Sequence, residues 1–225
     1  MAHNLNLSAF KYPLGFIRII EFIFIVIAIA AVNSWGVTVQ YRCPGTTPNA
    51  TTTNIQGVGT FSLPKVHLNS CNSTQLHLWG PEDGAAGSAG FFYFVNVTAL
   101  IYVLFVSFTY VILWQLYQSD KRIALADLGI TAVFFVLFFF CSSIWWAGAN
   151  TIGQSTSEEH LKQLFLESPE WKAQNSTFSS RSVNNGKLAI SVLCDWVNVL
   201  CFAFNIWFIW KEVVPRAAND PNTIA

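Results

Sequence analysis

Two charged side chains inside an apolar run are the first residues that could do chemistry. Arg18 and Glu21 lie in KYPLGFIRIIEFIFIVIAIA, residues 11–30, which otherwise has the composition of a membrane helix. Ionisable groups at membrane depth are costly and commonly mark functional sites. Two roles are open to this pair: a site inside the membrane, or charges at the boundary between lipid and water.

A second set of polar residues repeats along the last apolar run. Spacings of three, four and seven residues place its members on one helical face. They are Ser191, Asp195, Asn198 and Asn205. Such an intramembrane polar face can hold helices together through hydrogen bonds of about 0.6–2 kcal/mol each. It can also line a pore or a proton path, in which case the Asp195 carboxyl would need protonation or nearby water.

The sequence contains no other pattern that indicates an active site. Phosphate-binding glycine loops and nucleophile elbows are missing. Three cysteines lie within apolar runs, where packing is the ordinary role: Cys141, Cys194 and Cys201. The histidines are scattered, without a partner at metal-ligand spacing: His3, His67, His77 and His160. We therefore expect neither enzymatic activity nor a bound metal or cofactor.

The composition requires these residues to be positioned by membrane helices. The chain of 225 residues is 53% hydrophobic and 11% charged, whereas about a quarter of a soluble domain is charged. Basic and acidic residues number 12 each, so no net field favours nucleic acid as a partner. Each apolar run is long enough to cross about 30 Å of hydrocarbon as a helix. The predicted spans are residues 14–35, 91–116, 126–147 and 188–210.

Four spans place both termini on one side and the two long connections, residues 36–90 and 148–187, on the other. The first connection contains Cys43 and Cys71, and sequons for N-glycosylation begin at Asn49, Asn72 and Asn175. A cysteine pair with glycan acceptors is typical of an oxidising lumen. We therefore expect lumenal loops, and cytosolic ends at residues 1–12 and 214–225.

Local patterns predict some order in the lumenal loops. Hydrophobic residues alternate in GVTVQYRC, residues 36–43, and in STQLHLWG, residues 73–80, as in short strands. The segment STSEEHLKQLFLESPEW, residues 155–171, begins with a capping pattern and predicts a short helix that ends before Pro169. A Cys43–Cys71 bridge would stabilise the first loop by about 3–4 kcal/mol.

Several motifs resemble the synaptophysin family. These are YPLGFIRIIEF in the first span, LADLGITAVF and SSIWWAG in the third, and NIWFIWKE at the end of the fourth. The similarity runs through residues 10–213 in the same order and spacing. It implies an all-α membrane protein whose four transmembrane helices form a MARVEL domain, about residues 13–213, with disulfide-linked strands in loop one and a short helix in loop two.

The resemblance also implies a function. Family members are proteins of synaptic vesicles and other small transport vesicles, in which they organise the membrane and the trafficking and retrieval of synaptobrevin-type fusion proteins. They bind membrane lipids including cholesterol, form homo-oligomers and associate with the vesicular proton pump. Residues 148–187 lack the family's second cysteine pair and the chain stops at Ala225, so we expect a divergent or tail-less member. An oligomeric channel or transporter that uses the polar face of the fourth span is the alternative.

Cytosolic termini give the opening pair of charges a simple interpretation. Arg18 would lie in the first turns after Pro13, from which its side chain can reach anionic headgroups. Glu21 is three residues further on, close enough to pair with Arg18. The sequence thus predicts charges at the membrane boundary, with contact to a neighbouring helix as the alternative.

Overall fold

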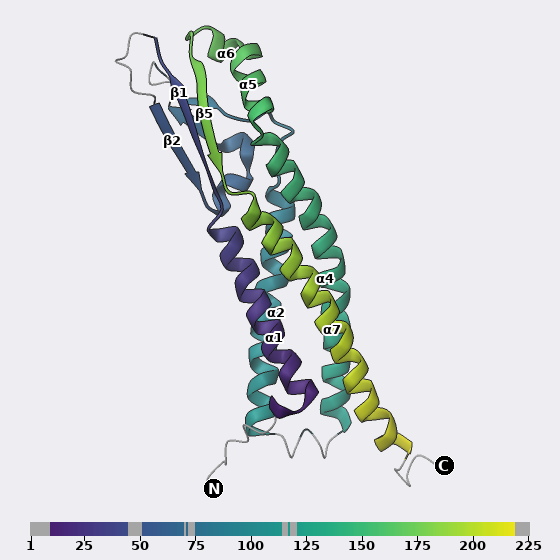
Figure 1. The fold of residues 1–225 in the computed structure, drawn as a ribbon. Coiled ribbons are helices and arrows are strands. Elements are labelled where there is room, and N and C mark those ends of the chain that lie inside the picture. The colour runs from purple at the N-terminus through teal and green to yellow at the C-terminus, as the bar shows by residue number, and fades with distance from the viewer. Residues whose placement is uncertain are drawn as a thin grey trace. The chain divides into compact units, whose positions relative to one another are not determined.

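Four long helices dominate the computed structural model, which describes residues 10–44, 51–69, 71, 75–113, 117 and 121–218 (Figure 1). All are long and apolar enough to cross a membrane. They are α1 (Pro13–Asn33), α2 (Ala86–Ile112), α4 (Lys121–Ser155) and α7 (Gly186–Ala218). The predicted fold class, four membrane helices with a small disulfide-linked strand region, is confirmed.

The helices differ in length from the apolar runs. α2 begins at Ala86 and ends at Ile112, whereas the apolar run covers residues 91–116. α4 extends beyond its apolar run at both ends, from Lys121 to Ser155. An apolar run marks the part of a helix that suits lipid. The helix itself continues through polar residues for as long as its backbone hydrogen bonds do.

The chain divides into two compact units, and each long helix contributes residues to both. The first unit comprises Met1–Ala28, Tyr93–Ser142 and Leu193–Ala225. The second comprises Ile29–Phe92 and Ser143–Val192, and it contains all the described strands.

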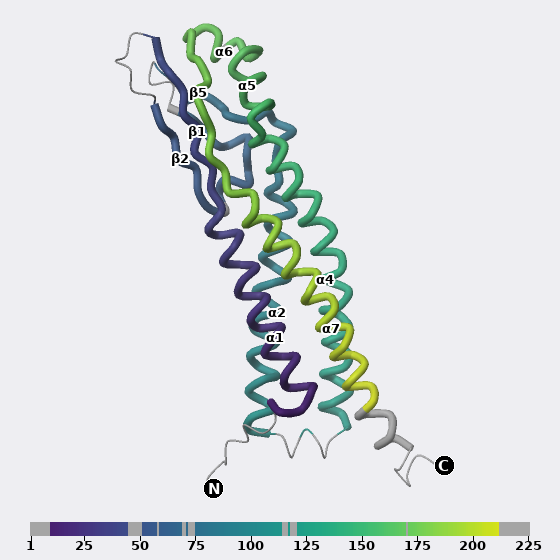
Figure 2. The backbone as a smooth tube through the Cα atoms, viewed as in Figure 1, coloured from purple at the N-terminus to yellow at the C-terminus, as the bar shows by residue number. Residues whose placement is uncertain are grey.

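A three-stranded antiparallel sheet organises the second unit. Its order is β2 (Thr51–Gln56), β1 (Gly36–Arg42) and β5 (Thr177–Val183), and Figure 2 shows these strands side by side. The central strand β1 buries Val37, Val39 and Tyr41 in alternation, as its sequence predicts. β5 escaped prediction because no side chain of this strand is fully buried, so it lacks an apolar alternation.

Helical turns from the second connection pack on the sheet. The predicted short helix is α5 (Glu158–Glu167), where the Ser157 side chain accepts the backbone N–H of His160 at 3.2 Å. It ends before Pro169, which opens the single turn α6 (Pro169–Lys172). Phe165 and Trp171 both contact Tyr41 of β1, with ring centroids 5.9 and 5.7 Å away. Aromatic packing thus ties this connection to the central strand.

A small hairpin completes the second unit. β3 (His67–Asn69) pairs with β4 (Gln75–His77), the second strand that the sequence predicted. The Cys43–Cys71 disulfide, with Cα atoms 5.5 Å apart, joins the end of β1 to the segment between β3 and β4. Two short strands alone are marginally stable, so the bridge is the covalent constraint that holds this hairpin near the sheet.

Replacement of Cys43 by Ser should destabilise the second unit. The bridge spans 28 residues, and closure of such a loop restricts the unfolded chain by about 3–4 kcal/mol. We expect a lower thermal unfolding midpoint and slower export from the endoplasmic reticulum. Cys71→Ser and the double variant are matched controls that should lose the same amount as Cys43→Ser. Normal export and stability of Cys43→Ser would show that the bridge is dispensable.

Candidate functional site

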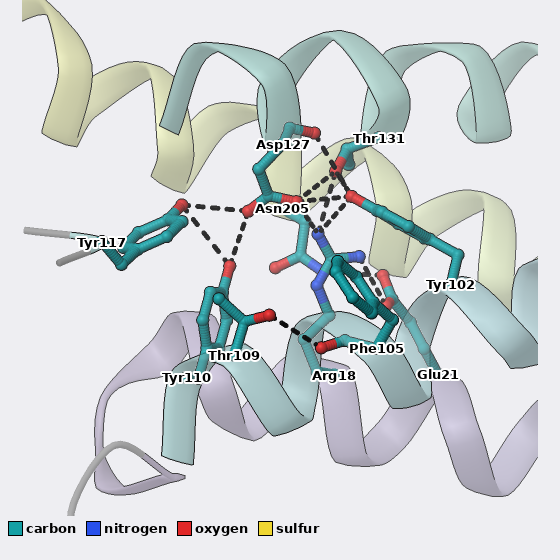
Figure 3. Close-up of polar contacts among 10 residues, drawn as sticks. All are labelled: Arg18, Glu21, Tyr102, Phe105, Thr109, Tyr110, Tyr117, Asp127, Thr131 and Asn205. Atoms are coloured by element: carbon teal, nitrogen blue, oxygen red, sulfur yellow. Dashed lines mark hydrogen bonds and ion pairs between the residues drawn. The ribbon is translucent and has the colours of Figure 1, made fainter. Parts of the chain in front are cut away.

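A buried arginine lies at the centre of the first unit. Arg18 is fully buried, and one end nitrogen of its guanidinium donates to Glu21 Oε2 at 2.9 Å. The other donates to Asp127 Oδ1 at 3.0 Å and to Thr131 Oγ1 at 2.9 Å (Figure 3). The guanidinium also lies 5.1 Å from the ring centroid of Tyr102, within cation–π range. One side chain of α1 therefore bonds to both α2 and α4.

Asp127 is held by three tyrosines as well as by Arg18. Its Oδ1 accepts from the Tyr102 hydroxyl, while Oδ2 accepts from Tyr110 at 2.7 Å and Tyr117 at 2.9 Å. Figure 3 shows Tyr110 and Tyr117 converging on one carboxylate oxygen. Hydroxyl donors from three tyrosines therefore occupy both oxygens of this buried carboxyl group.

Glu21 connects the same cluster to α7. Its Oε1 accepts from Asn205 Nδ2 at 2.6 Å, and its Oε2 is bound to Arg18. All four long helices therefore contribute to one set of polar contacts, which we call the Arg18 network. Its members are Arg18, Glu21, Tyr102, Tyr110, Tyr117, Asp127, Thr131 and Asn205.

The structure corrects the expectation of boundary charges at Arg18 and Glu21. Both residues are fully buried, and they pair with each other and with neighbouring helices instead of reaching headgroups. The physical reason is their place on α1. The residues Leu14, Arg18, Glu21, Ile25 and Ala28 alternate in spacing by four and three, and all are buried. Such spacing forms the seam of a packed helix, so the two charges face the bundle interior.

The partners of Arg18 were missed by sequence reasoning. Asp127 lay inside the predicted third span and was the one available signal, because an acidic residue there needs a donor. Tyr102, Tyr110 and Tyr117 gave no such signal, since tyrosine is common near span ends for its amphipathic ring. Which tyrosines bind Asp127 depends on which helix surfaces face each other, and no short sequence motif encodes that arrangement.

A second polar cluster of the first unit is incompletely bonded. Asp195 and Asn198 are fully buried, and Asp195 interacts with Cys141 Sγ at 3.7 Å and with the Asn96 side chain. Among the described residues, Asp195 Oδ1 and both side-chain polar atoms of Asn198 have no hydrogen-bond partner. Buried polar atoms of this kind commonly bind an internal water, ion or proton.

The four residues of the polar face predicted on the fourth span thus lie in three different environments. All four of its residues are fully buried. Asn205 belongs to the Arg18 network, and Asp195 with Asn198 forms the second cluster. Ser191 lies in the second unit, where it accepts from Trp145 Nε1 at 2.8 Å and donates to the Leu188 carbonyl at 2.7 Å.

The remaining predicted sites lie in the connections. Cys43 and Cys71 are bonded to each other. Asn175 is exposed and adopts a left-handed backbone conformation, φ 49°, just before β5. The sequon asparagines Asn49 and Asn72 lie outside the described residues. Within the described ranges, no group of three or more His, Cys, Asp or Glu side chains could hold a metal ion.

Comparison with protein families gives a match over most of the chain. The family described as MARVEL, a membrane-associating domain, matches residues 9–208. The matched range includes α1, α2 and α4 in full and most of α7. It also includes every residue of the Arg18 network.

Replacement of Arg18 by Met should strongly destabilise the protein. The change leaves Glu21 and Asp127 buried without their cation, and removal of one partner from a buried pair costs about 3–5 kcal/mol. Unfolding in detergent micelles or bicelles measures the loss. The matched control is Lys162→Met, which breaks an exposed pair with Glu158 and should leave the unfolding transition almost unchanged, because solvent screens such pairs. Equal small effects of both changes would contradict a structural role for the Arg18 network.

Proposed function

The chain belongs to the MARVEL family of membrane-associating proteins, and on that premise we propose that it is a synaptophysin-like protein of synaptic or small transport vesicles. In this proposal it is not an enzyme. It organises the vesicle membrane and the trafficking and retrieval of synaptobrevin-type fusion proteins through contacts between transmembrane helices. It also forms homo-oligomers, and it packs against membrane lipids that include cholesterol.

The apolar outer surface of the spans is the observation that carries the proposal. The charged side chains of Arg18, Glu21 and Asp127 are buried. In contrast, Ile101, Phe105 and Phe108 of α2 are each more than 60% exposed. Large apolar side chains also project from the other long helices, among them Phe140 on α4 and Phe204 on α7. In a bilayer such surfaces contact lipid tails and other membrane helices by close packing. They therefore suit lateral association with a single-span fusion protein.

The two connections support the proposed orientation. The Cys43–Cys71 disulfide is a feature of oxidising compartments. Asn175 in the second connection lies in an exposed turn, where a glycosylating enzyme could reach it. Both observations favour lumenal loops and cytosolic termini.

Recovery of a synaptobrevin-type protein with the purified chain tests the proposal. Because the contact is assigned to the spans, replacement of outward side chains by Ala on the responsible helix should lower recovery several-fold. The variant sets are Ile101, Phe105 and Phe108 on α2; Val133, Val136 and Phe140 on α4; and Leu193, Leu200 and Phe204 on α7. Leu166→Ala, in the exposed part of α5, is the control that should change nothing. Recovery that is insensitive to all three sets, or lost with Leu166→Ala, would overturn the proposal.

The incompletely bonded Asp195 cluster favours a second function, the oligomeric channel or transporter. A pore or proton path needs polar atoms that are free to bind a passing ion or water, and Asp195 and Asn198 have such atoms. In the proposed organiser, these atoms serve only to bind internal water or a proton between helices.

Currents across reconstituted bilayers distinguish the two functions. For a vesicle organiser we expect silent bilayers for the unchanged chain and for Asp195→Ala, Asn198→Ala and Ser191→Ala. Ser191 is the matched control, because it lies on the same helix but is fully occupied by Trp145 and Leu188. Currents that vanish in Asp195→Ala or Asn198→Ala and persist in Ser191→Ala would contradict the vesicle-organiser function and support the channel.

A further inference from the structure

We propose that His67 and His77 form a binding site for a divalent transition-metal ion of the Zn²⁺ type on the β3–β4 hairpin. Ten residues separate them in the sequence, so their spacing indicated no metal site. The fold places them directly opposite each other in the antiparallel register. Their ring centroids are 4.5 Å apart, and both side chains are exposed.

The opposition of the two strands brings two nitrogen ligands within reach of one ion. Side chains of directly opposed residues leave the same face of an antiparallel pair, with Cβ atoms about 4.5–5.5 Å apart. Zinc binds imidazole nitrogen at about 2.0–2.1 Å, so two tetrahedral ligand atoms lie about 3.3 Å from each other. The rings are inclined by 62°. Because both side chains are exposed, rotation about their side-chain bonds can aim the two nitrogens at a common point.

A backbone hydrogen bond prepares His77 as a ligand. Its Nδ1 lies 2.7 Å from the carbonyl oxygen of Pro64, which can only accept, so Nδ1 carries the proton. The lone pair of neutral His77 is then on Nε2. Metal-binding histidines commonly donate their second ring N–H to a backbone carbonyl in this way, which fixes the tautomer and the ring orientation. Two surface histidines that bind no metal would not require a hydrogen bond that fixes the tautomer of one ring.

The scaffold around the pair is constrained and open to solvent. The Cys43–Cys71 disulfide holds the segment between the two strands, and the backbone N–H of Leu78 donates to the Val66 carbonyl at 3.3 Å. The Leu78–Val66 hydrogen bond fixes the end of the hairpin from which the histidines project, and the disulfide holds the opposite end. Water would complete the coordination shell, as expected for a site with two protein ligands. The bound ion would act as a second link across a hairpin of three-residue strands.

Zinc binding to the purified full-length chain tests the site. We expect one Zn²⁺ per chain by calorimetry, two imidazole ligands by X-ray absorption, and a higher unfolding midpoint with Zn²⁺ present. His67→Asn and His77→Asn should each weaken binding by about tenfold or more, since loss of even an outer-shell partner costs 10- to 100-fold. Each should also reduce the zinc-dependent rise in the midpoint.

Two other histidines provide the controls. His160→Asn alters a half-buried histidine whose Nε2 lies 3.5 Å from Asp83 Oδ2, and His3→Asn removes the histidine nearest the N-terminus. Neither change should alter zinc binding by this site. Circular dichroism without metal checks that His67→Asn and His77→Asn keep the fold. The site is refuted if zinc does not bind, if X-ray absorption finds fewer than two imidazoles, or if His67→Asn and His77→Asn bind zinc as tightly as the unchanged chain.

Discussion

The guanidinium of Arg18 is fully buried, so side chains of the bundle must provide the acceptors that replace water around its charge. Glu21, Asp127, Thr131 and the Tyr102 hydroxyl supply acceptors for its two end nitrogens, whereas its Nε has no partner among the described residues. Tyr110, Tyr117 and Asn205 in turn donate to the two carboxylates. A rotated or shifted helix would leave a charge or a polar atom without a partner. The requirement to neutralise one buried cation therefore selects the faces that α1, α2, α4 and α7 turn towards one another in the first unit.

Because the charged side chains of the Arg18 network are buried in the first unit, the outer surface of the spans is apolar. Helices in lipid associate through close packing and interhelical hydrogen bonds, and a buried charge network becomes costly when its members lose their partners. The inside can thus specify the bundle, while residues such as Phe105 and Phe204 remain available for lipid and partner helices. In the Asp195 cluster, Asp195 Oδ1 and both side-chain polar atoms of Asn198 have no partner among the described residues, and it is where a second activity would reside.

Much of the architecture could be predicted from local patterns. Apolar length predicted the four spans, alternation predicted β1 and β4, and the capping pattern before Glu158 predicted α5. Relations between distant residues could not be predicted. Asp127 as the partner of Arg18, β5 beside β1, and His67 opposite His77 all depend on tertiary pairing, for which a single sequence carries no periodic signal. The boundary interpretation of Arg18 failed for the same reason, because it considered the helix without its neighbours.

A double-mutant cycle between Arg18 and Asp127 tests the central claim most directly. Arg18→Met, Asp127→Asn and their combination would be unfolded under one set of bilayer-like conditions. If the two side chains stabilise the bundle as one unit, the double variant loses less than the sum of the single losses, by about 2 kcal/mol or more. Losses that add to within about 0.5 kcal/mol would show that Arg18 and Asp127 act independently, and would contradict the account.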